Sequence, residues 1–364
     1  MRGDAVRGAA ALGRPGALGA GALGRRGGLG ALGAGDLGQL GALGAADLGQ
    51  LGALGAAAAA SATAAANGRP AGGAPPLVRL VRLPSVMTVP GDALLGAAWA
   101  RNGAEEGRGA PGVLVLASSL LYLGGMALND WADREVDARE RPSRPIPAGE
   151  VAPQLALGIA SGLSGAALLV AAGTGGPQAL RVALPLTAAV WGYDLVAKDT
   201  AAGPWTMALA RSLDVMLGAG KRPRSAAPVA LLVGAHTLIV TLVSRREAEG
   251  ADDARLPVGA LAGVAATTAA AAALALRRRH EQPRATAAAL ACFALYASAL
   301  GKAGVAAARR PDAPHLQRMV GAGVLGLMPL QAGLLALCGR PRAAAAIVAA
   351  WPLARRAARK AAVT

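Results

Sequence analysis

Long apolar runs that carry almost no charge constrain this chain more than any other feature. They occupy residues 111–128, 151–180, 225–244, 256–276, 285–301 and 319–339. A helix needs about 20 apolar residues to cross a hydrocarbon core of about 30 Å, and several of these runs reach that length. Alanine and glycine fill much of them, which suits helices that pack closely in a bilayer. The sequence therefore predicts an all-α integral membrane protein that crosses the cell membrane several times.

A bundle of about nine transmembrane helices is expected. The predicted ranges are 83–100, 111–128, 154–173, 177–193, 200–219, 225–244, 256–276, 285–301 and 319–339. The fifth range contains Arg211 and Asp214, and ionisable residues inside a span are costly unless they face the bundle interior or a wet cavity. Arg211 is therefore a candidate catalytic residue, with a self-neutralising pair inside the helix as the alternative. Nine spans place four loops on one face, assigned to the cytoplasm: 129–153, 194–199, 245–255 and 302–318.

The chain divides into three parts. Residues 1–76 are low in complexity and repeat the unit DLGQLGALGA at 36–45 and 47–56. Glycine at that density opposes a stable helix, so we expect this segment to be disordered or to precede the true start codon. Residues 77–340 form the predicted membrane domain, and residues 341–364 form a basic C-terminal tail.

The distribution of charge argues against a nucleic-acid partner. The formal net charge is +16, from 37 Lys and Arg against 21 Asp and Glu, but the basic residues are scattered through the loops. Aromatic residues make up 2% of the chain, too few to interleave with a basic patch. Basic loops at membrane edges are expected to contact lipid headgroups instead. Cys292 and Cys338 lie in apolar runs and predict neither a disulfide nor a zinc site.

Acidic residues gather directly after the second predicted span. Asp130, Asp133 and Asp137 stand at positions i, i+3 and i+7, so a helix that continues out of the span presents them on one side. Neighbouring carboxylates repel each other unless a cation joins them. Mg²⁺ takes oxygen ligands from few carboxylates, from water and from substrate phosphates. The spacing predicts a Mg²⁺ site, with a solvated acidic loop as the alternative.

An arginine-rich loop follows these aspartates. In RPSRPIPAGEV, residues 141–151, three prolines stiffen a segment that carries Arg141 and Arg144. A rigid guanidinium fork suits phosphate oxygens, because it can donate two parallel hydrogen bonds. A metal-binding face beside such a loop predicts a diphosphate site.

These motifs resemble the UbiA superfamily of intramembrane prenyltransferases. NDWADREVD, residues 129–137, matches the first motif NDxxDxxxD, and the arginine-rich loop is similar to the segment that follows it there. YDLVAKDTAAGP, residues 193–204, resembles the YxxxKRxT region, although Ala197 stands where the Lys is expected and Lys198 where the Arg is. A similarity to the EboC-like branch rests on SRRE at 244–247, GPWTMALARSLDVMLG at 203–218 and RMVGAGVLGLMPLQA at 318–332.

The second aspartate motif of the family departs from its pattern in this chain. It should follow the sixth span, near residues 241–253, where Ser244 stands in place of the first Asp. The resemblance leaves Glu247 and Glu249 as candidate metal ligands of this region. Arg245 and Arg246 become candidates to offset the diphosphate charge directly.

The resemblance implies transfer of a prenyl group from an allylic prenyl diphosphate to an acceptor that the sequence does not identify. Mg²⁺ on the three aspartates would make the diphosphate a better leaving group. Lys198 and Arg144 would hold the leaving oxygens, and the Tyr193 ring, like Trp131 and Trp191, is a candidate to stabilise the allylic cation. Substrate contacts are also expected from Asn129, Arg134, Arg141, Lys198, Arg245 and Arg246.

Two other functions stay open. The substitution at Ser244 allows a catalytically lapsed UbiA-like protein that acts as a lipid-binding or export component. A phosphatidyl-group transferase also uses aspartates and magnesium at a membrane edge. NDWADRE, however, lacks the DGxxAR core that such a resemblance requires.

Overall fold

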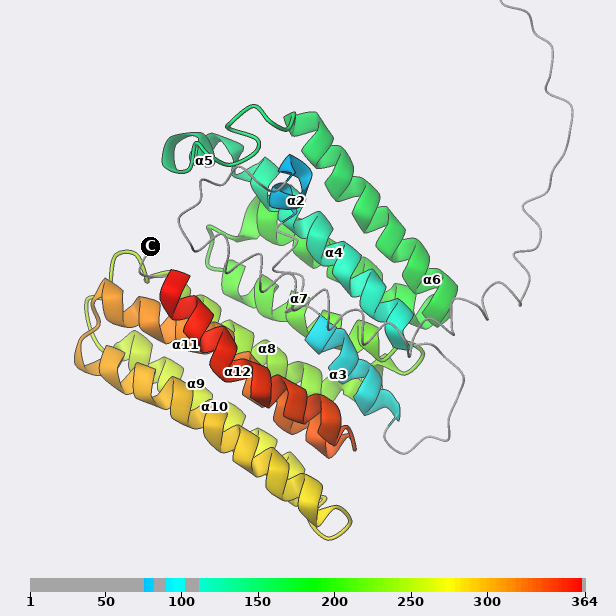
Figure 1. The fold of residues 1–364 in the computed structure, drawn as a ribbon, viewed down its shortest axis with the longest axis vertical. Coiled ribbons are helices and arrows are strands. Elements are labelled where there is room, and N and C mark those ends of the chain that lie inside the picture. The colour runs from blue at the N-terminus through cyan, green and yellow to red at the C-terminus, as the bar shows by residue number, and fades with distance from the viewer. Residues whose placement is uncertain (1–74, 82–89, 102–110, 362–364) are drawn as a thin grey trace, which may run out of the picture. The chain divides into compact units, whose positions relative to one another are not determined.

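The computed structural model describes residues 75–81, 90–101 and 111–361, and most of these residues lie in helices (Figure 1). The predicted low-complexity segment 1–76 lies almost entirely outside the described residues. The π-helix η2 (Tyr193–Ala197) and the 3₁₀-helix η3 (Pro223–Ala226) each adjoin an α-helix. The α-helices are α2 (Pro76–Leu80), α3 (Pro90–Arg101), α4 (Pro111–Ala132), α5 (Arg134–Glu140), α6 (Pro153–Gly192), α7 (Gly203–Gly218), α8 (Ala227–Ser244), α9 (Arg255–Leu276), α10 (Pro283–Arg309), α11 (Ala313–Leu337) and α12 (Pro341–Ala361).

A bilayer core explains why the described residues form helices and no strands. Each backbone N–H and C=O group in hydrocarbon must be satisfied internally, and a helix does this within one segment. The predicted all-α membrane architecture is confirmed, while the count of nine spans stays a prediction. Six described segments are long and apolar enough to cross a membrane: Val113–Ala132, Pro153–Ala197, Pro223–Ser244, Arg255–Leu276, Pro283–Arg309 and Ala313–Leu337.

Helix α6 consists of two antiparallel halves joined at Gly176. Its 40 residues would extend for about 60 Å if straight, twice the hydrocarbon thickness. At Gly176 φ is +63° and ψ is −156°, a conformation that glycine adopts far more readily than other residues, and Pro177 begins the second half. Trp191 Nε1 donates to Ser164 Oγ at 3.1 Å, so the two halves lie side by side. The reversal falls between the predicted spans 154–173 and 177–193.

Glycines allow α3 and α7 to touch backbone to backbone. A Cβ atom on Gly218 would lie 2.0 Å from the Ala93 carbonyl oxygen, and a Cβ atom on Gly96 would lie 1.8 Å from the Val215 carbonyl oxygen. This crossing therefore depends on residues without side chains, as is common between membrane helices. The largest hydrophobic core extends from it through α8, α9, α10 and α11 to α12.

A polar cluster inside the bundle joins three helices. Asp92 of α3 is fully buried, accepts a hydrogen bond from Gln331 Nε2 of α11 at 2.6 Å and pairs with Arg211 of α7 at 3.0 Å. The ion pair thus connects two helices. The alternative predicted from the sequence was a pair of Arg211 with Asp214 inside one helix. Because an unpaired charge is costly in a low-dielectric interior, this cluster holds α3 against the rest of the bundle.

Loops predicted to share one face do contact each other. Lys198 contacts Asp133, and Arg245 Nη2 donates to the Asp199 carbonyl oxygen at 3.4 Å. The Ala251 N–H donates to the Pro311 carbonyl oxygen at 2.8 Å. The loops after α4, after η2, after α8 and after α10 therefore gather at one end of the bundle.

The basic C-terminal segment, predicted as a tail, forms helix α12. Ala344, Ile347 and Val348 pack against the largest hydrophobic core, and Trp351 is buried. The Arg355 guanidinium carbon lies 4.8 Å from the centre of the Trp351 ring. Much of the segment is therefore part of the folded bundle.

We expect Asp92→Ala to destabilise the bundle, because it removes the carboxylate that pairs with the Arg211 guanidinium at 3.0 Å. The expected loss is about 2–3 kcal/mol, below the 3–5 kcal/mol typical of fully buried pairs because Arg211 keeps some exposure. The measurement is unfolding of the purified protein in detergent. The double variant Asp92→Ala/Arg211→Ala should recover part of the loss. An unchanged unfolding curve for Asp92→Ala would show that the ion pair does not hold α3 in place.

Candidate active site

The three aspartates of the predicted face lie where α4 ends and α5 begins. The Asp133 N–H donates to the Asn129 carbonyl at 2.9 Å and the Asp137 N–H to the Asp133 carbonyl at 2.8 Å, so the helical hydrogen bonding continues from α4 into α5. Asp130 and Asp137 are buried, with 3% and 2% exposure. Buried carboxylates need partners, and other segments of the chain supply them.

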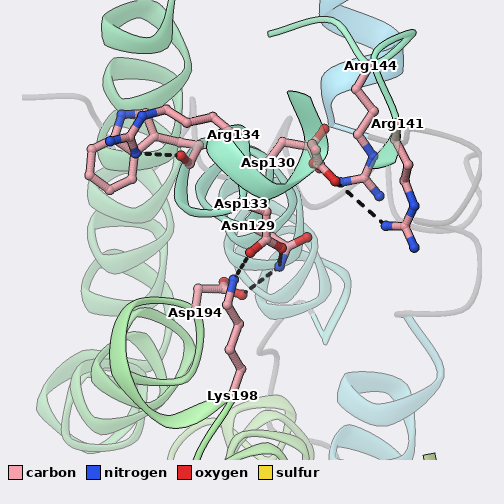
Figure 2. Close-up of polar contacts among 10 residues, drawn as sticks. Asn129, Asp130, Asp133, Arg134, Arg141, Arg144, Asp194 and Lys198 are labelled. Carbon is pink, nitrogen blue, oxygen red and sulfur yellow. Dashed lines mark hydrogen bonds and ion pairs between the residues drawn. The ribbon is translucent and has the colours of Figure 1, made fainter. Parts of the chain in front are cut away.

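Two of these aspartates share one arginine. Arg144 Nη1 donates to Asp130 Oδ1 at 3.1 Å and also contacts Asp137 Oδ2. Arg141 Nη1 approaches Asp137 Oδ1 at 3.8 Å from the exposed side. Figure 2 shows both arginines reaching the aspartates from the same side. The arginine-rich loop predicted to bind a diphosphate therefore folds back onto the predicted metal ligands.

The arginine-rich loop is braced by α2. Arg79 Nη1 donates to Glu150 Oε2 at 2.7 Å, and Arg79 Nη2 donates to the Ser143 carbonyl oxygen at 2.6 Å. Within the loop, the side chains of Pro145 and Ile146 are buried. The brace fixes the backbone from which Arg144 extends, and it ties this loop to the start of the membrane domain.

Asp133 belongs to a second group of contacts, so the three aspartates do not converge on one point as the spacing predicted. Asn129 Nδ2 donates to Asp133 Oδ2 and to Asp194 Oδ1, both at 3.1 Å, and Lys198 Nζ contacts Asp133 Oδ1 (Figure 2). Asp194 is 6% exposed. Asp194 was not among the site residues predicted from the sequence. Its spacing of four residues from Lys198 was the available signal, because the first turn beyond α6 brings such positions to one side.

The π-helix η2 places Lys198. The Lys198 N–H donates to the Tyr193 carbonyl oxygen at 2.9 Å, and π-turns of this kind often occur at functional sites. Tyr193 interacts electrostatically with Asp133, Asp194 and Asp199, so this predicted catalytic residue lies in the same region. A Cβ atom on Gly203 would lie 2.8 Å from the carbonyl oxygens of both Ala197 and Lys198, so the turn after η2 needs glycine there.

The donor chemistry of this region fits Mg²⁺. We call Asp130, Asp133, Asp137 and Asp194 the aspartate cluster. Arg144 contacts Asp130 and Asp137, Lys198 contacts Asp133, and Arg141 approaches Asp137 at a longer distance. Among the described residues, no three carboxylate, His or Cys side chains converge on one point. Mg²⁺ needs only one or two protein carboxylates when water and phosphate oxygens complete its shell, so the pairs in the cluster suffice.

The α8–α9 loop approaches the site through Arg245. Its guanidinium contacts the carbonyl oxygens of Thr200 and Asp199. Arg246 pairs with Glu249 at 3.7 Å, and both side chains are exposed. Glu247 is half-buried, and burial raises the pKa of its carboxyl group. The metal-binding roles of Glu247 and Glu249 and the substrate-binding role of Arg246 stay predictions.

Two predicted site residues lie apart from the aspartate cluster. Arg134 points away from it in Figure 2 and stacks on the Trp131 ring, with its guanidinium carbon 4.7 Å from the ring centre. Arg211 lies inside the bundle, paired with Asp92. Their predicted substrate-binding and catalytic roles are not supported by these contacts and stay predictions.

The chain belongs to the UbiA prenyltransferase family, whose model matches residues 92–308. It is 54% identical over 46 residues to a digeranylgeranylglyceryl phosphate synthase from Methanothrix thermoacetophila, which covers 12% of this chain and 17% of the relative. A synthase of the same name from Metallosphaera sedula is 36% identical over 105 residues, 29% of this chain and 37% of the relative. These matches span less than half of either relative. The EboC-like subgroup stays a prediction.

A solved structure supports the fold. It is described as "Structural and mechanistic insights into the biosynthesis of Digeranylgeranylglyceryl phosphate synthase in membranes", and it superposes with a TM-score of 0.55 at 15% identity. The superposition covers 71% of this chain and 96% of the other. At 15% sequence identity, this similarity shows a shared fold and no more.

We expect Gly203→Ala to displace Lys198 from the aspartate cluster. The added methyl group collides with two carbonyl oxygens, which should cost about 1–3 kcal/mol as overpacking does. Gly192→Ala is the matched control, because a Cβ atom there meets nothing within 4 Å. The measurements are thermal unfolding and Mg²⁺ affinity of the two variants. Equal behaviour of both would show that the turn after η2 tolerates a side chain.

Proposed function

We propose that this protein transfers a prenyl group from an allylic prenyl diphosphate to an acceptor within the membrane, with Mg²⁺ as cofactor. The observation that carries the proposal is the aspartate cluster at the end of a helix bundle, where carboxylates lie beside the cationic side chains of Arg144 and Lys198. Membership of the UbiA family supports prenyl transfer as the reaction class. The apolar bundle beside the site is suited to a prenyl chain.

The aspartate cluster would hold the metal, whose contribution is to stabilise negative charge on the leaving diphosphate. Asp130 and Asp137 form one pair of carboxylates, and Asp133 and Asp194 form the other. Asn129 keeps the second pair together by donating to both. Asp194 thereby offers a carboxylate from another helix beside the first motif.

Arg144 and Lys198 would bind and orient the diphosphate. Both side chains now neutralise aspartates, and both lie where an incoming phosphate oxygen competes for the same donors. A planar guanidinium can bind two phosphate oxygens, which suits Arg144 to fix the leaving group. Arg141, exposed beside Arg144, extends the positive surface toward water. Tyr193 is the candidate to face the allylic cation, since an aromatic ring attracts positive charge.

The acceptor is a separate part of the proposal. The relatives named above are digeranylgeranylglyceryl phosphate synthases, so a prenylated glyceryl phosphate lipid is the first acceptor to test. Lipid extracts from cells with and without the protein, compared by mass spectrometry, would reveal the prenylated product. A water-soluble product would contradict an acceptor within the membrane.

A catalytically lapsed lipid-binding or export component is the alternative function. Ser244 and Ala197 favour it, because each stands where the family pattern has a charged residue. Such a protein would bind a nonhydrolysable prenyl diphosphate without a requirement for Mg²⁺. Binding measured with and without Mg²⁺ therefore separates the two functions.

Replacing Asp130 or Asp133 with Asn should abolish Mg²⁺-dependent binding of a prenyl diphosphate, because each change removes an anionic ligand from one pair. Asp194→Asn should raise the Mg²⁺ concentration needed for half-maximal binding by about tenfold, the effect of losing about 1.4 kcal/mol. The control is Glu140→Gln, since Glu140 is an exposed residue of α5 outside the cluster. Unchanged Mg²⁺ dependence in Asp130→Asn would contradict the metal site.

The degraded second motif can be tested by a pair of opposite changes. Glu247→Gln should reduce product formation if the half-buried carboxyl completes the metal site, because a neutral amide binds Mg²⁺ less well. Ser244→Asp should be tolerated or should raise Mg²⁺ affinity, since it adds a hard oxygen ligand. Product formation is measured against Mg²⁺ concentration in membranes. If Glu247→Gln leaves the whole curve unchanged, this loop is not part of the metal site.

A further inference from the structure

A groove lies between the end of α4 and the start of α6, on the side of α4 to which Arg134 turns. Its volume is about 630 Å³, and it is lined by Trp131, Arg134, Pro153, Gln154, Leu157, Gly158 and Ser161. The aspartate cluster contributes none of these lining residues. The groove is therefore distinct from the site proposed for prenyl transfer.

The polar end of the groove is a preformed site for an anion. Arg134 stacks on the Trp131 ring, and its Nη1 donates to the Trp131 carbonyl oxygen at 2.9 Å, so the guanidinium is held in place. Its partner Glu135 lies at 3.3 Å, but the Glu135 side chain is 81% exposed and such surface pairs contribute little. Among the described residues that line the groove, Arg134 carries a charge and Gln154 adds an uncharged amide donor, while the Ser161 hydroxyl donates to the Leu157 carbonyl oxygen at 2.9 Å.

The position of the groove matches the level of lipid headgroups. The candidate span in α4 ends at Ala132 and that in α6 begins at Pro153, so we expect Arg134 and Trp131 near the boundary between hydrocarbon and water. Tryptophan and arginine are typical of this level. Leu157 and Gly158 continue the groove along α6 toward the apolar side, and a Cβ atom on Gly158 would meet nothing within 4 Å. A molecule with a phosphate at one end and an acyl chain at the other fits both parts.

We propose that this groove binds an anionic phospholipid, with the phosphate on Arg134 and an acyl chain along Leu157 and Gly158. The positive charge of Arg134 favours an anionic lipid over a zwitterionic one, whose ammonium group would lie close to the guanidinium. The inference does not depend on the reaction proposed above. It assigns Arg134 a partner on the lipid side of the bundle, where its side chain points.

The experiment places the full-length protein in nanodiscs that contain phosphatidylglycerol or phosphatidylcholine with brominated acyl chains. Bromine quenches nearby tryptophan fluorescence, and the difference between wild type and Trp131→Phe isolates the signal of Trp131. We expect brominated phosphatidylglycerol to quench Trp131 at about one fifth of the concentration that phosphatidylcholine requires, as expected for one basic contact. Arg134→Gln should remove this preference, and Arg134→Lys should keep part of it.

Arg139→Gln is the matched control, because it removes an exposed arginine of α5 that does not line the groove. Equal quenching by the two lipids in the wild type would overturn the proposal, as would a preference that survives Arg134→Gln or is lost in Arg139→Gln. A third arm adds a soluble prenyl diphosphate with Mg²⁺. Relief of quenching in this arm would assign the groove to the substrate and would also overturn the lipid proposal.

Discussion

Neutralisation of clustered carboxylates by cations from other parts of the chain is the interaction on which the active-site end of this molecule depends. Asp130 and Asp137 are almost fully buried and share Arg144, which stands on the loop that follows α5. Asp133 is held by Lys198, which follows η2. Without these cations the carboxylates would repel each other and would have to stay exposed to water or protonated. The fold of the arginine-rich loop and the end of α6 therefore follow from the charge on α4 and α5.

The same principle acts inside the bundle with a different result. Asp92 and Arg211 neutralise each other far from the aspartate cluster, and Gln331 satisfies a further oxygen of the carboxylate. This pair connects α3 to α7, and the buried Asp214 carboxylate interacts with both of its members. The aspartate cluster differs in position, because it lies at the end of the bundle where the loops gather and the Asp133 side chain keeps 27% exposure. A metal ion or a phosphate group can therefore reach the aspartate cluster, whereas the interior pair serves as a connection between helices.

The departures from the family pattern are concentrated in the second half of the proposed site. Ala197 and Ser244 each remove a charge that the family pattern has, one basic and one acidic. Asp194 is joined to Asp133 through Asn129, and the Arg245 guanidinium contacts the turn after η2. The proposed site therefore offers carboxylates for Mg²⁺ and cationic side chains for a diphosphate.

Much of the architecture could be predicted from the sequence because it depends on local interactions. Uncharged runs of about 20 residues become helices in a bilayer, since hydrocarbon leaves the backbone no other partner. The reversal at Gly176 lies between two predicted spans, and the spacing of the first-motif aspartates places them along one helical path. Contacts between segments distant in the chain could not be predicted in this way. Asn129 bridges Asp133 to Asp194 across 65 residues, and Arg211 pairs with α3, because these partners are decided by how the helices cross and not by spacing along any one of them. Arg134 lines the groove beside α6 for the same reason, although its neighbours in sequence belong to the aspartate cluster.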